Sequence, residues 1–227
     1  GYGRKTIGFR IANVRDTPET LGDEPYMYYQ KYFGQVPVAV CGQRDLAITE
    51  LLGTYPYLRA ILMDDAMQHR RVVPSVTIMT TTFSNPFYKD YVLPSGRLRE
   101  ARQGAQRAQI IIVTKCPELL NGAEQVKIKH EIAQYSDASV FFSSIDYQEL
   151  KPIFGFDLEI KKKVVCISGL ANPEPFERYV KRQFDVVLSH HYRDHYRYKE
   201  EDIKDIIKEL DDETMLVTTE KDMVKLR

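Results

Sequence analysis

The run Gln109-Ile110-Ile111-Ile112-Val113-Thr114 decides the fold class, because it is a continuous β-branched segment with the length of one strand. Such a run is typical of a β-strand. Similar short apolar runs occur on either side of it and alternate with helical patterns. We expect these further strands at 36–40, 60–63, 75–80, 139–142, 164–168, 185–188 and 215–218. Strands that alternate with helices predict an α/β fold with a mostly parallel sheet.

A change in composition suggests a second domain. The run Lys161-Lys162-Lys163 separates the long first series of strands from a shorter second series. We therefore expect a core domain over residues 1–155 and a second, smaller α/β domain over 156–227. The clearest helical patterns are expected at 45–52, 175–182 and 199–210.

Composition excludes several classes of protein. The 227 residues are 43% hydrophobic and 28% charged, which is too apolar for a disordered chain. Lys+Arg and Asp+Glu are both 32, so a globally basic nucleic-acid binder is excluded and no nucleic-acid partner is expected. No apolar run approaches the roughly 20 residues that a membrane-spanning helix needs. The three cysteines are far apart and form no metal-binding pair, so we expect reduced thiols in a cytosolic protein.

The most informative polar stretch follows the expected strand at 60–63. Asp64 and Asp65 would lie at the carboxyl end of that strand, where ligands bind in open α/β sheets, and their oxygens suit Mg²⁺. If a helical turn follows, Gln68 and His69 lie on the face of Asp65, and Arg70 can meet phosphate oxygens. A helix start with a solvated charged face explains the same residues equally well.

Two further segments carry candidate chemistry. In Leu93–Glu100, Arg99 can clamp a phosphate and Glu100 can reach a metal directly or through water. Taken alone, this string fits an exposed ion pair on a surface loop better. Asp23, in Gly22-Asp23-Glu24-Pro25, suits a helix N-cap, and the sharper alternative is a general base.

The histidine-rich segment 190–196 follows an expected strand. His191 and His195 have the spacing of a zinc pair, but a third ligand at a useful distance is missing, so an acid–base or structural histidine is favoured. The charges of Thr218-Thr219-Glu220-Lys221-Asp222 suit a turn, a helix cap or a phosphate contact, and the residues do not decide between these. The phosphate-binding loop Gly-x-x-x-x-Gly-Lys-[Ser/Thr] is not found in this sequence.

Seven short motifs, taken in order, resemble those of the tetraacyldisaccharide 4′-kinases, and the resemblance runs from residue 1 to residue 227. The motifs are Gly-Tyr-Gly-Arg-Lys, Gly-Asp-Glu-Pro, Asp-Asp-x-x-Gln-His-Arg, Leu-Pro-x-Gly-x-Leu-Arg-Glu, Gly-x-x-Asn-Pro, Asp-His and Thr-Thr-Glu-Lys-Asp. The resemblance implies a P-loop kinase core, a smaller α/β domain joined by a hinge, and an active site in the cleft between them. It also implies transfer of the γ-phosphate of ATP, with Mg²⁺, to the 4′-hydroxyl of tetraacyldisaccharide 1-phosphate. It further implies a peripheral enzyme of lipid A synthesis, which works at the cytoplasmic face of the inner membrane of a Gram-negative bacterium.

The resemblance also assigns roles to residues. Asp23 matches the proposed base for the 4′-hydroxyl, and His195 matches the histidine that pairs with this base. The two residues lie on different expected domains, so closure of the cleft would bring them together. Asp64 and Asp65 match the acidic pair that serves Mg²⁺, with Gln68 and Glu100 as further metal or metal-water contacts. Arg99 is expected to neutralise charge on the transferred phosphoryl group. The weaker candidates for the anionic lipid headgroup are Arg4, Lys5, Arg44, His69 and Arg70.

The sequence departs from the family pattern in two ways. Ala66 replaces a glycine that often follows the two aspartates, which is compatible with a helix start. The P-loop and the amphipathic membrane-docking segment, which the family carries upstream, are absent from the sequence. We therefore expect an internal portion of the kinase, with negligible activity by itself. Two alternatives remain: a non-catalytic domain that binds anions or lipid headgroups, and a phosphotransferase for another class of substrate.

Overall fold

The computed structural model describes residues 4–153 and 159–226, and the chain divides into two compact units. The first unit combines Gly1–Ile61 with Glu149–Arg227, and the second is Leu62–Gln148. The expected domain boundary at 155/156 and the first three residues of the Gly-Tyr-Gly-Arg-Lys motif lie outside the described residues. The division into 1–155 and 156–227 therefore stays a prediction.

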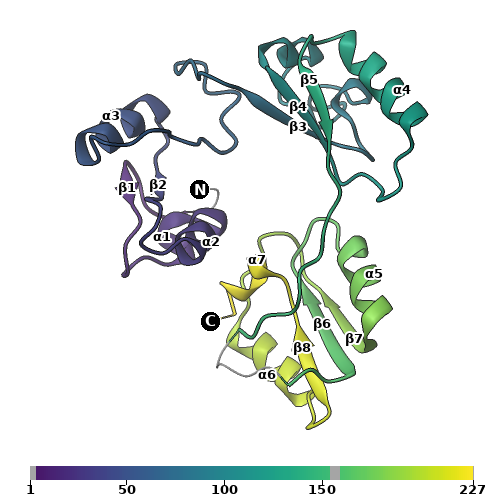
Figure 1. Ribbon diagram of the computed structural model, residues 1–227. Helices are drawn as coiled ribbons and strands as arrows, with labels where there is room; N and C mark the ends of the chain where they lie inside the picture. The colour runs from purple at the N-terminus through teal and green to yellow at the C-terminus, as the bar shows by residue number, and fades with distance from the viewer. Residues whose placement is uncertain (1–3, 154–158, 227) are drawn as a thin grey trace. The chain divides into compact units, whose positions relative to one another are not determined.

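The second unit is built on a parallel three-stranded sheet with the order β3-β4-β5 (Figure 1). Its strands are β3 (Ile78–Thr82), β4 (Ile110–Thr114) and β5 (Ser139–Phe142). In β4, Ile111 and Val113 are buried, whereas the other three residues of the strand are half-buried. One face of the sheet therefore forms the core of this unit.

Helical segments complete the core of the second unit. Helix α4 (Gly122–Ala133) begins where the side chain of Asn121 accepts a hydrogen bond from the backbone N–H of Glu124, which caps the helix. Two 3₁₀ segments, η1 (Phe87–Lys89) and η2 (Arg102–Arg107), add further side chains. The buried cluster consists of Phe87, Tyr88, Ala105, Ala108, Ile111, Val113, Cys116 and Ile132.

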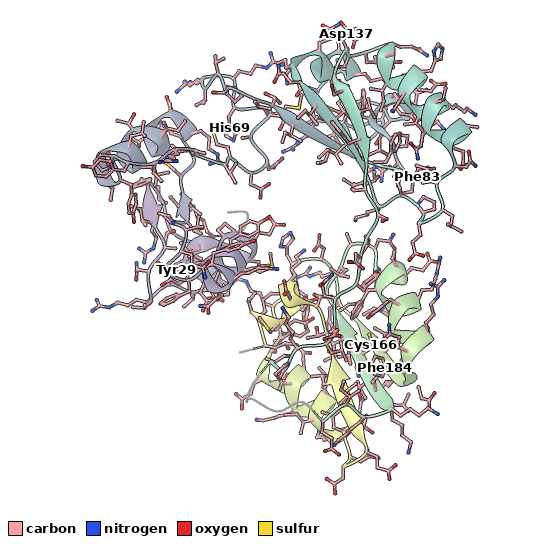
Figure 2. The ribbon with its side chains drawn as sticks, in the orientation of Figure 1. Tyr29, His69, Phe83, Asp137, Cys166 and Phe184 are labelled. Atoms are coloured by element: carbon pink, nitrogen blue, oxygen red, sulfur yellow. The ribbon has the colours of Figure 1, made fainter. Side chains whose placement is uncertain are left out.

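The first unit contains a second parallel sheet, with the order β7-β6-β8 (Figure 1). The strands are β6 (Lys163–Ser168), β7 (Asp185–His191) and β8 (Thr214–Val217), and helices α5 (Glu174–Gln183), α6 (Glu200–Lys208) and α7 (Glu220–Met223) accompany them. Phe184 packs against the buried Cys166 of the central strand (Figure 2). Burial raises the pKa of the Cys166 thiol to about 12, so this cysteine is unreactive at neutral pH.

The remaining elements of the first unit come from its N-terminal segment. Strands β1 (Arg10–Ile11) and β2 (Ala39–Val40) pair antiparallel. Helices α1 (Pro18–Leu21) and α2 (Asp23–Lys31) follow one another across Gly22, and α3 (Arg44–Thr54) follows β2. Gly22 has a φ of 95°, a conformation that favours glycine, and it lets α2 start directly after the fully buried Leu21.

Most expected strands are confirmed, together with the α/β fold and its parallel sheets. The expected strand at 75–80 begins later, at Ile78, and the one at 36–40 is shortened to Ala39–Val40. The expected strand at 60–63 is wrong: the segment is irregular, and Leu62 is 96% exposed. A buried strand needs a hydrogen-bonded neighbour, and none of the strands in the described residues pairs with this segment.

Across residues 4–153 and 159–226, no helix combines the length and the apolar character required to cross a membrane.

Candidate active site

An aspartate and a histidine that are 172 residues apart in sequence meet in the first unit. Asp23 is the first residue of α2, and His195 lies in the loop after β7. The imidazole Nδ1 of His195 lies 3.1 Å from Oδ2 of Asp23. The two side chains are 31% and 18% exposed, so the pair is sheltered but still reachable by a substrate. Both residues belong to one compact unit, and their contact does not require movement between units.

The backbone at His195 is held in an unusual conformation. Its φ of 58° lies in the left-handed region, which costs a non-glycine residue about 1–3 kcal/mol and requires support from its surroundings. Asp194 gives that support, because its Oδ1 accepts the backbone N–H of His195 at 3.0 Å. Its other oxygen, Oδ2, lies 3.8 Å from Nε2 of the same imidazole. Asp194 therefore contacts both the backbone and the ring of His195.

Asp194 is itself held by Lys221, the second residue of α7. Burial acts to raise the pKa of the Asp194 carboxyl, but the hydrogen bond and charge of Lys221, together with the contacts of His195, outweigh it, so the pKa is lowered. The carboxylate is thus kept ionised as an acceptor for His195. Asp23, His195, Asp194 and Lys221 form one chain of contacts.

The turn that carries Lys221 is anchored by a buried carboxylate. Asp222 accepts hydrogen bonds from the backbone N–H of Gly169 at 2.9 Å and from the hydroxyl of Thr219 at 2.8 Å, and its Oδ1 lies 2.9 Å from Nζ of Lys225. Gly169 directly follows β6, and a Cβ at this position would lie 2.8 Å from Asp222 Oδ1. Only glycine permits this close approach, which explains the glycine of the Gly-x-x-Asn-Pro motif.

We expect Asp222→Asn to change the acid stability of the chain. Burial acts to raise the pKa of Asp222, but the hydrogen bond from Gly169 and the charge of Lys225 outweigh it, so the pKa is lowered. A lowered folded-state pKa gives stability that is fully present above the unfolded value of about 3.9 and is lost as the pH falls through the folded value. Urea unfolding between neutral pH and roughly pH 3 should therefore show a shallower acid loss in Asp222→Asn than in the wild type.

The control for this experiment is Asp205→Asn. Asp205 also pairs with a lysine, Lys208, but both side chains are mostly exposed. Water and salt screen such a pair, so its removal should leave the acid dependence almost unchanged. Parallel acid loss in the wild type and Asp222→Asn would show that Asp222 does not contribute in this way.

A second cluster lies in the second unit and centres on Glu100. Its carboxylate accepts hydrogen bonds from Arg107 at 2.6 Å, Arg70 at 3.0 Å and Gln68 at 3.1 Å. The hydrogen bond from Arg107 is the largest cause of a lowered pKa at Glu100; burial opposes it, and Arg70 and Gln68 add to it. The structure thus brings three residues predicted from sequence together, Gln68, Arg70 and Glu100.

Arg99, which directly precedes Glu100 in the sequence, forms a bidentate ion pair with Asp65. Both terminal nitrogens of the Arg99 guanidinium contact the Asp65 carboxylate. The pair raises the pKa of Arg99, so the guanidinium stays charged. Both side chains are more than half exposed. Asp65 has a φ of 46°, a second left-handed site among the candidate residues. Asp64 and Asp65 therefore lie in an irregular loop and not at a strand end.

The donor set around Asp64 and Asp65 fits Mg²⁺. Among the described residues, no three His, Cys, Asp or Glu side chains gather in a way that would hold a metal ion by themselves. Mg²⁺ at kinase sites, however, is held by one or two carboxylates with water and the phosphates of the substrate. The adjacent exposed carboxylates of Asp64 and Asp65 supply that number of ligands, although the Asp65 carboxylate is paired with Arg99 in this structure.

The other predicted residues have different surroundings. Arg4 donates to the carbonyl of Gly8 at 2.8 Å, and Arg44 donates to the carbonyl of Cys41. Lys5 is exposed, and His69 is exposed in the loop that precedes β3 (Figure 2). Arg4, Lys5 and Arg44 lie in the first unit and His69 lies in the second, and their assignment to the lipid headgroup stays a prediction.

The zinc alternative is not supported by the contacts of the two histidines. His191 Nε2 lies 2.6 Å from Glu177 on α5, whereas His195 points to Asp23. The two imidazoles thus have different carboxylate partners, as expected for structural and acid–base histidines.

Two contributors were missed in the sequence analysis. Arg107, in η2, is the principal partner of Glu100, and nothing in its local sequence distinguishes it from other surface arginines. Lys221 was included only as part of a charged motif without a defined role. The signal that could have identified it is its position directly after the last strand, at the end of the sheet where His195 also follows a strand.

Comparison with known proteins decides the family. The family model described as tetraacyldisaccharide-1-P 4′-kinase matches residues 1–227. The chain belongs to this family. The resemblance inferred from the seven motifs is thereby confirmed.

Curated members of the tetraacyldisaccharide 4′-kinase family support the assignment. The enzyme of that name from Flavobacterium johnsoniae is 38% identical, and the alignment covers all of this chain and 67% of the relative. The enzyme of Flavobacterium psychrophilum is 40% identical, with all of this chain and 66% of the relative covered. The chain thus spans about two thirds of the length of these relatives.

A solved structure confirms the fold. The crystal structure of the "apo" form of LpxK from Aquifex aeolicus in complex with ATP matches with a TM-score of 0.68 and 23% identity. The match covers 99% of this chain and 67% of that chain. The expected P-loop kinase type of α/β fold is therefore confirmed for this family member.

Proposed function

We propose that the whole protein transfers the γ-phosphate of ATP to the 4′-hydroxyl of tetraacyldisaccharide 1-phosphate, a step in lipid A synthesis. Membership of the tetraacyldisaccharide 4′-kinase family supports this reaction and this acceptor. ATP as the donor is supported by the ATP complex of the structural relative. Because the acceptor is a lipid, the reaction is assigned to a membrane surface, and the family resemblance points to the cytoplasmic face of the inner membrane.

The observation that carries the proposal is the contact between Asp23 and His195. A kinase that acts on an alcohol must remove the proton of the attacking hydroxyl, and a positioned carboxylate is suited to accept it. In the tautomer protonated at Nδ1, His195 donates to Oδ2 of Asp23 and fixes the orientation of the carboxylate. The 4′-oxygen then forms a bond to the γ-phosphorus as the bond to ADP breaks, and the proton passes to Asp23.

Two groups of residues in the second unit would manage negative charge in this reaction. Arg99 is a permanently charged, exposed guanidinium, and it is assigned to the transferred phosphoryl group. Asp64 and Asp65 would hold Mg²⁺, which supplies neutralisation of phosphate charge when bound. Gln68 and Glu100 are expected from sequence to be further metal or metal-water contacts. In the structure the Glu100 carboxylate is already engaged by Gln68, Arg70 and Arg107, so we assign both residues to orienting this loop instead.

The acceptor distinguishes this function from the alternatives. The whole protein is incubated with ATP, Mg²⁺ and either tetraacyldisaccharide 1-phosphate or its deacylated form, and product is identified by mass spectrometry. The proposal expects a 4′-phosphorylated product from the acylated acceptor and much less from the deacylated one. Equal transfer to both would indicate a phosphotransferase for another substrate class, and binding without transfer would indicate a non-catalytic domain.

A further inference from the structure

The segment Thr219–Asp222 has no role in the reaction described above, yet three of its successive side chains reach different parts of the first unit. Glu220 contacts Lys31 of α2 at 2.9 Å. Lys221 contacts Asp194, which precedes His195. Asp222 accepts the backbone N–H of Gly169 at 2.9 Å. This short turn therefore touches both segments that supply the Asp23–His195 pair, and it is anchored in the core of the same unit.

We propose that Lys221 is a positioning residue, which holds His195 toward Asp23 through the carboxylate of Asp194. This inference rests on the proposed function, because it gives a purpose to the geometry of the pair. Lys221 touches no reacting atom; it acts through Asp194.

The contact between Lys221 and Asp194 is partly sheltered, because Lys221 is mostly covered whereas Asp194 is more exposed. The two side chains are 21% and 37% exposed, so water screens their attraction less than at an open surface. Asp194 in turn accepts the backbone N–H of His195 at 3.0 Å. Because His195 has a left-handed backbone, the loop would relax toward commoner conformations without this acceptor. Lys221 therefore supports the conformation that aims Nδ1 at Asp23.

The neighbouring contact of Glu220 with Lys31 is weaker. These side chains are 55% and 50% exposed, and exposed ion pairs contribute little because solvent and salt screen them. Asp222, by contrast, is fully buried and anchors the turn itself. Among the three charged residues of the turn, Lys221 is thus the one whose removal should affect His195 with least effect on folding.

The test compares Lys221→Met, Lys221→Arg, Asp194→Asn and the double variant Lys221→Met/Asp194→Asn in the whole protein. Lys208→Met is the matched control, because Lys208 forms an ion pair of similar length with Asp205 on the exposed surface of the same unit. Two readouts are taken: steady-state transfer to tetraacyldisaccharide 1-phosphate, and the imidazole ¹⁵N signals of His195. Thermal unfolding confirms that each variant is folded.

We expect Lys221→Met to lower kcat about 10-fold while KM for ATP changes less than about twofold, the pattern of a lost transition-state contribution. Lys221→Arg should recover most of the rate, since it restores the charge. The double variant should be no slower than the slower single variant, because both act through one chain of contacts. The His195 signals should shift in Lys221→Met and Asp194→Asn but not in Lys208→Met.

The inference is overturned if the wild type is active and Lys221→Met has the same kcat and the same His195 signals as the wild type. Rate losses that multiply in the double variant would also overturn it. If the wild type does not transfer phosphate, the proposed function fails, and the imidazole signals still decide whether Lys221 positions His195. If Lys221→Met does not fold, the other two single variants decide. Shifted His195 signals in Asp194→Asn and preserved His195 signals in Lys221→Arg support the inference. Any other pattern contradicts it.

Discussion

Asp23→Asn is expected to lower kcat for phosphate transfer about 10²–10⁴-fold in the whole protein, the usual contribution of a general base. The amide keeps the size of the side chain but cannot accept the hydroxyl proton. KM for ATP should change little, because Asp23 contacts the acceptor and not the nucleotide in the proposed reaction. Steady-state kinetics together with a separate measurement of ATP binding tests this expectation.

Glu24→Gln is the matched control for Asp23→Asn. Glu24 is the next residue of α2, also in the first turn and exposed, so it shares the local backbone but not the contact with His195. Its replacement should leave kcat unchanged. A folded Asp23→Asn variant that retains the wild-type rate would exclude Asp23 as the base.

Arg99→Met is expected to lower kcat about 10³-fold, by analogy with arginines that neutralise a transferred phosphoryl group. Stability should hardly change, because Arg99 and Asp65 are both more than half exposed and such surface pairs contribute only about 0–1 kcal/mol. A purely structural surface ion pair also predicts a small change in stability, but it predicts no change in rate. Transfer kinetics and urea unfolding on the same variant separate the two.

Arg97→Met serves as the control for Arg99→Met. Arg97 lies two residues earlier in the same loop and also pairs with an aspartate, Asp90, at 3.2 Å. The two arginines therefore have similar chemistry and exposure, and only Arg99 is assigned to the phosphoryl group. Equal losses in both variants would mean that the loop, and not the Arg99 guanidinium, is required.

The strands that could be predicted from sequence are those whose own residues form an apolar, β-branched run. The run Ile110–Thr114 is apolar and β-branched, and it forms a strand in which Ile111 and Val113 are buried. The same holds for Lys163–Ser168, whose residues after the first are buried. The segment 60–63 is also apolar, but no strand in the described part of the chain pairs with it. Local composition cannot report whether a neighbouring strand is present.

The candidate site was predictable only in part. The local sequence allows Asp23 to be a helix cap or a general base, and it does not decide the role of His195. The pairing of the two residues is implied only by the family resemblance. The structure adds how the pair is held: Asp194 accepts the N–H of a left-handed His195, and Lys221 holds Asp194. Contacts of this kind join segments far apart in the chain, so no local pattern encodes them.

The role of the Asp23–His195 pair is tested most directly by a double-mutant cycle on kcat for phosphate transfer. The cycle compares Asp23→Asn, His195→Gln and the double variant with the wild type. If His195 acts by orienting Asp23, each single variant is slow and the double variant is within about threefold of Asp23→Asn alone, because the residues work as one unit. If the two losses multiply in the double variant, the residues act independently, and the contact between Nδ1 of His195 and Oδ2 of Asp23 does not carry the function assigned to it.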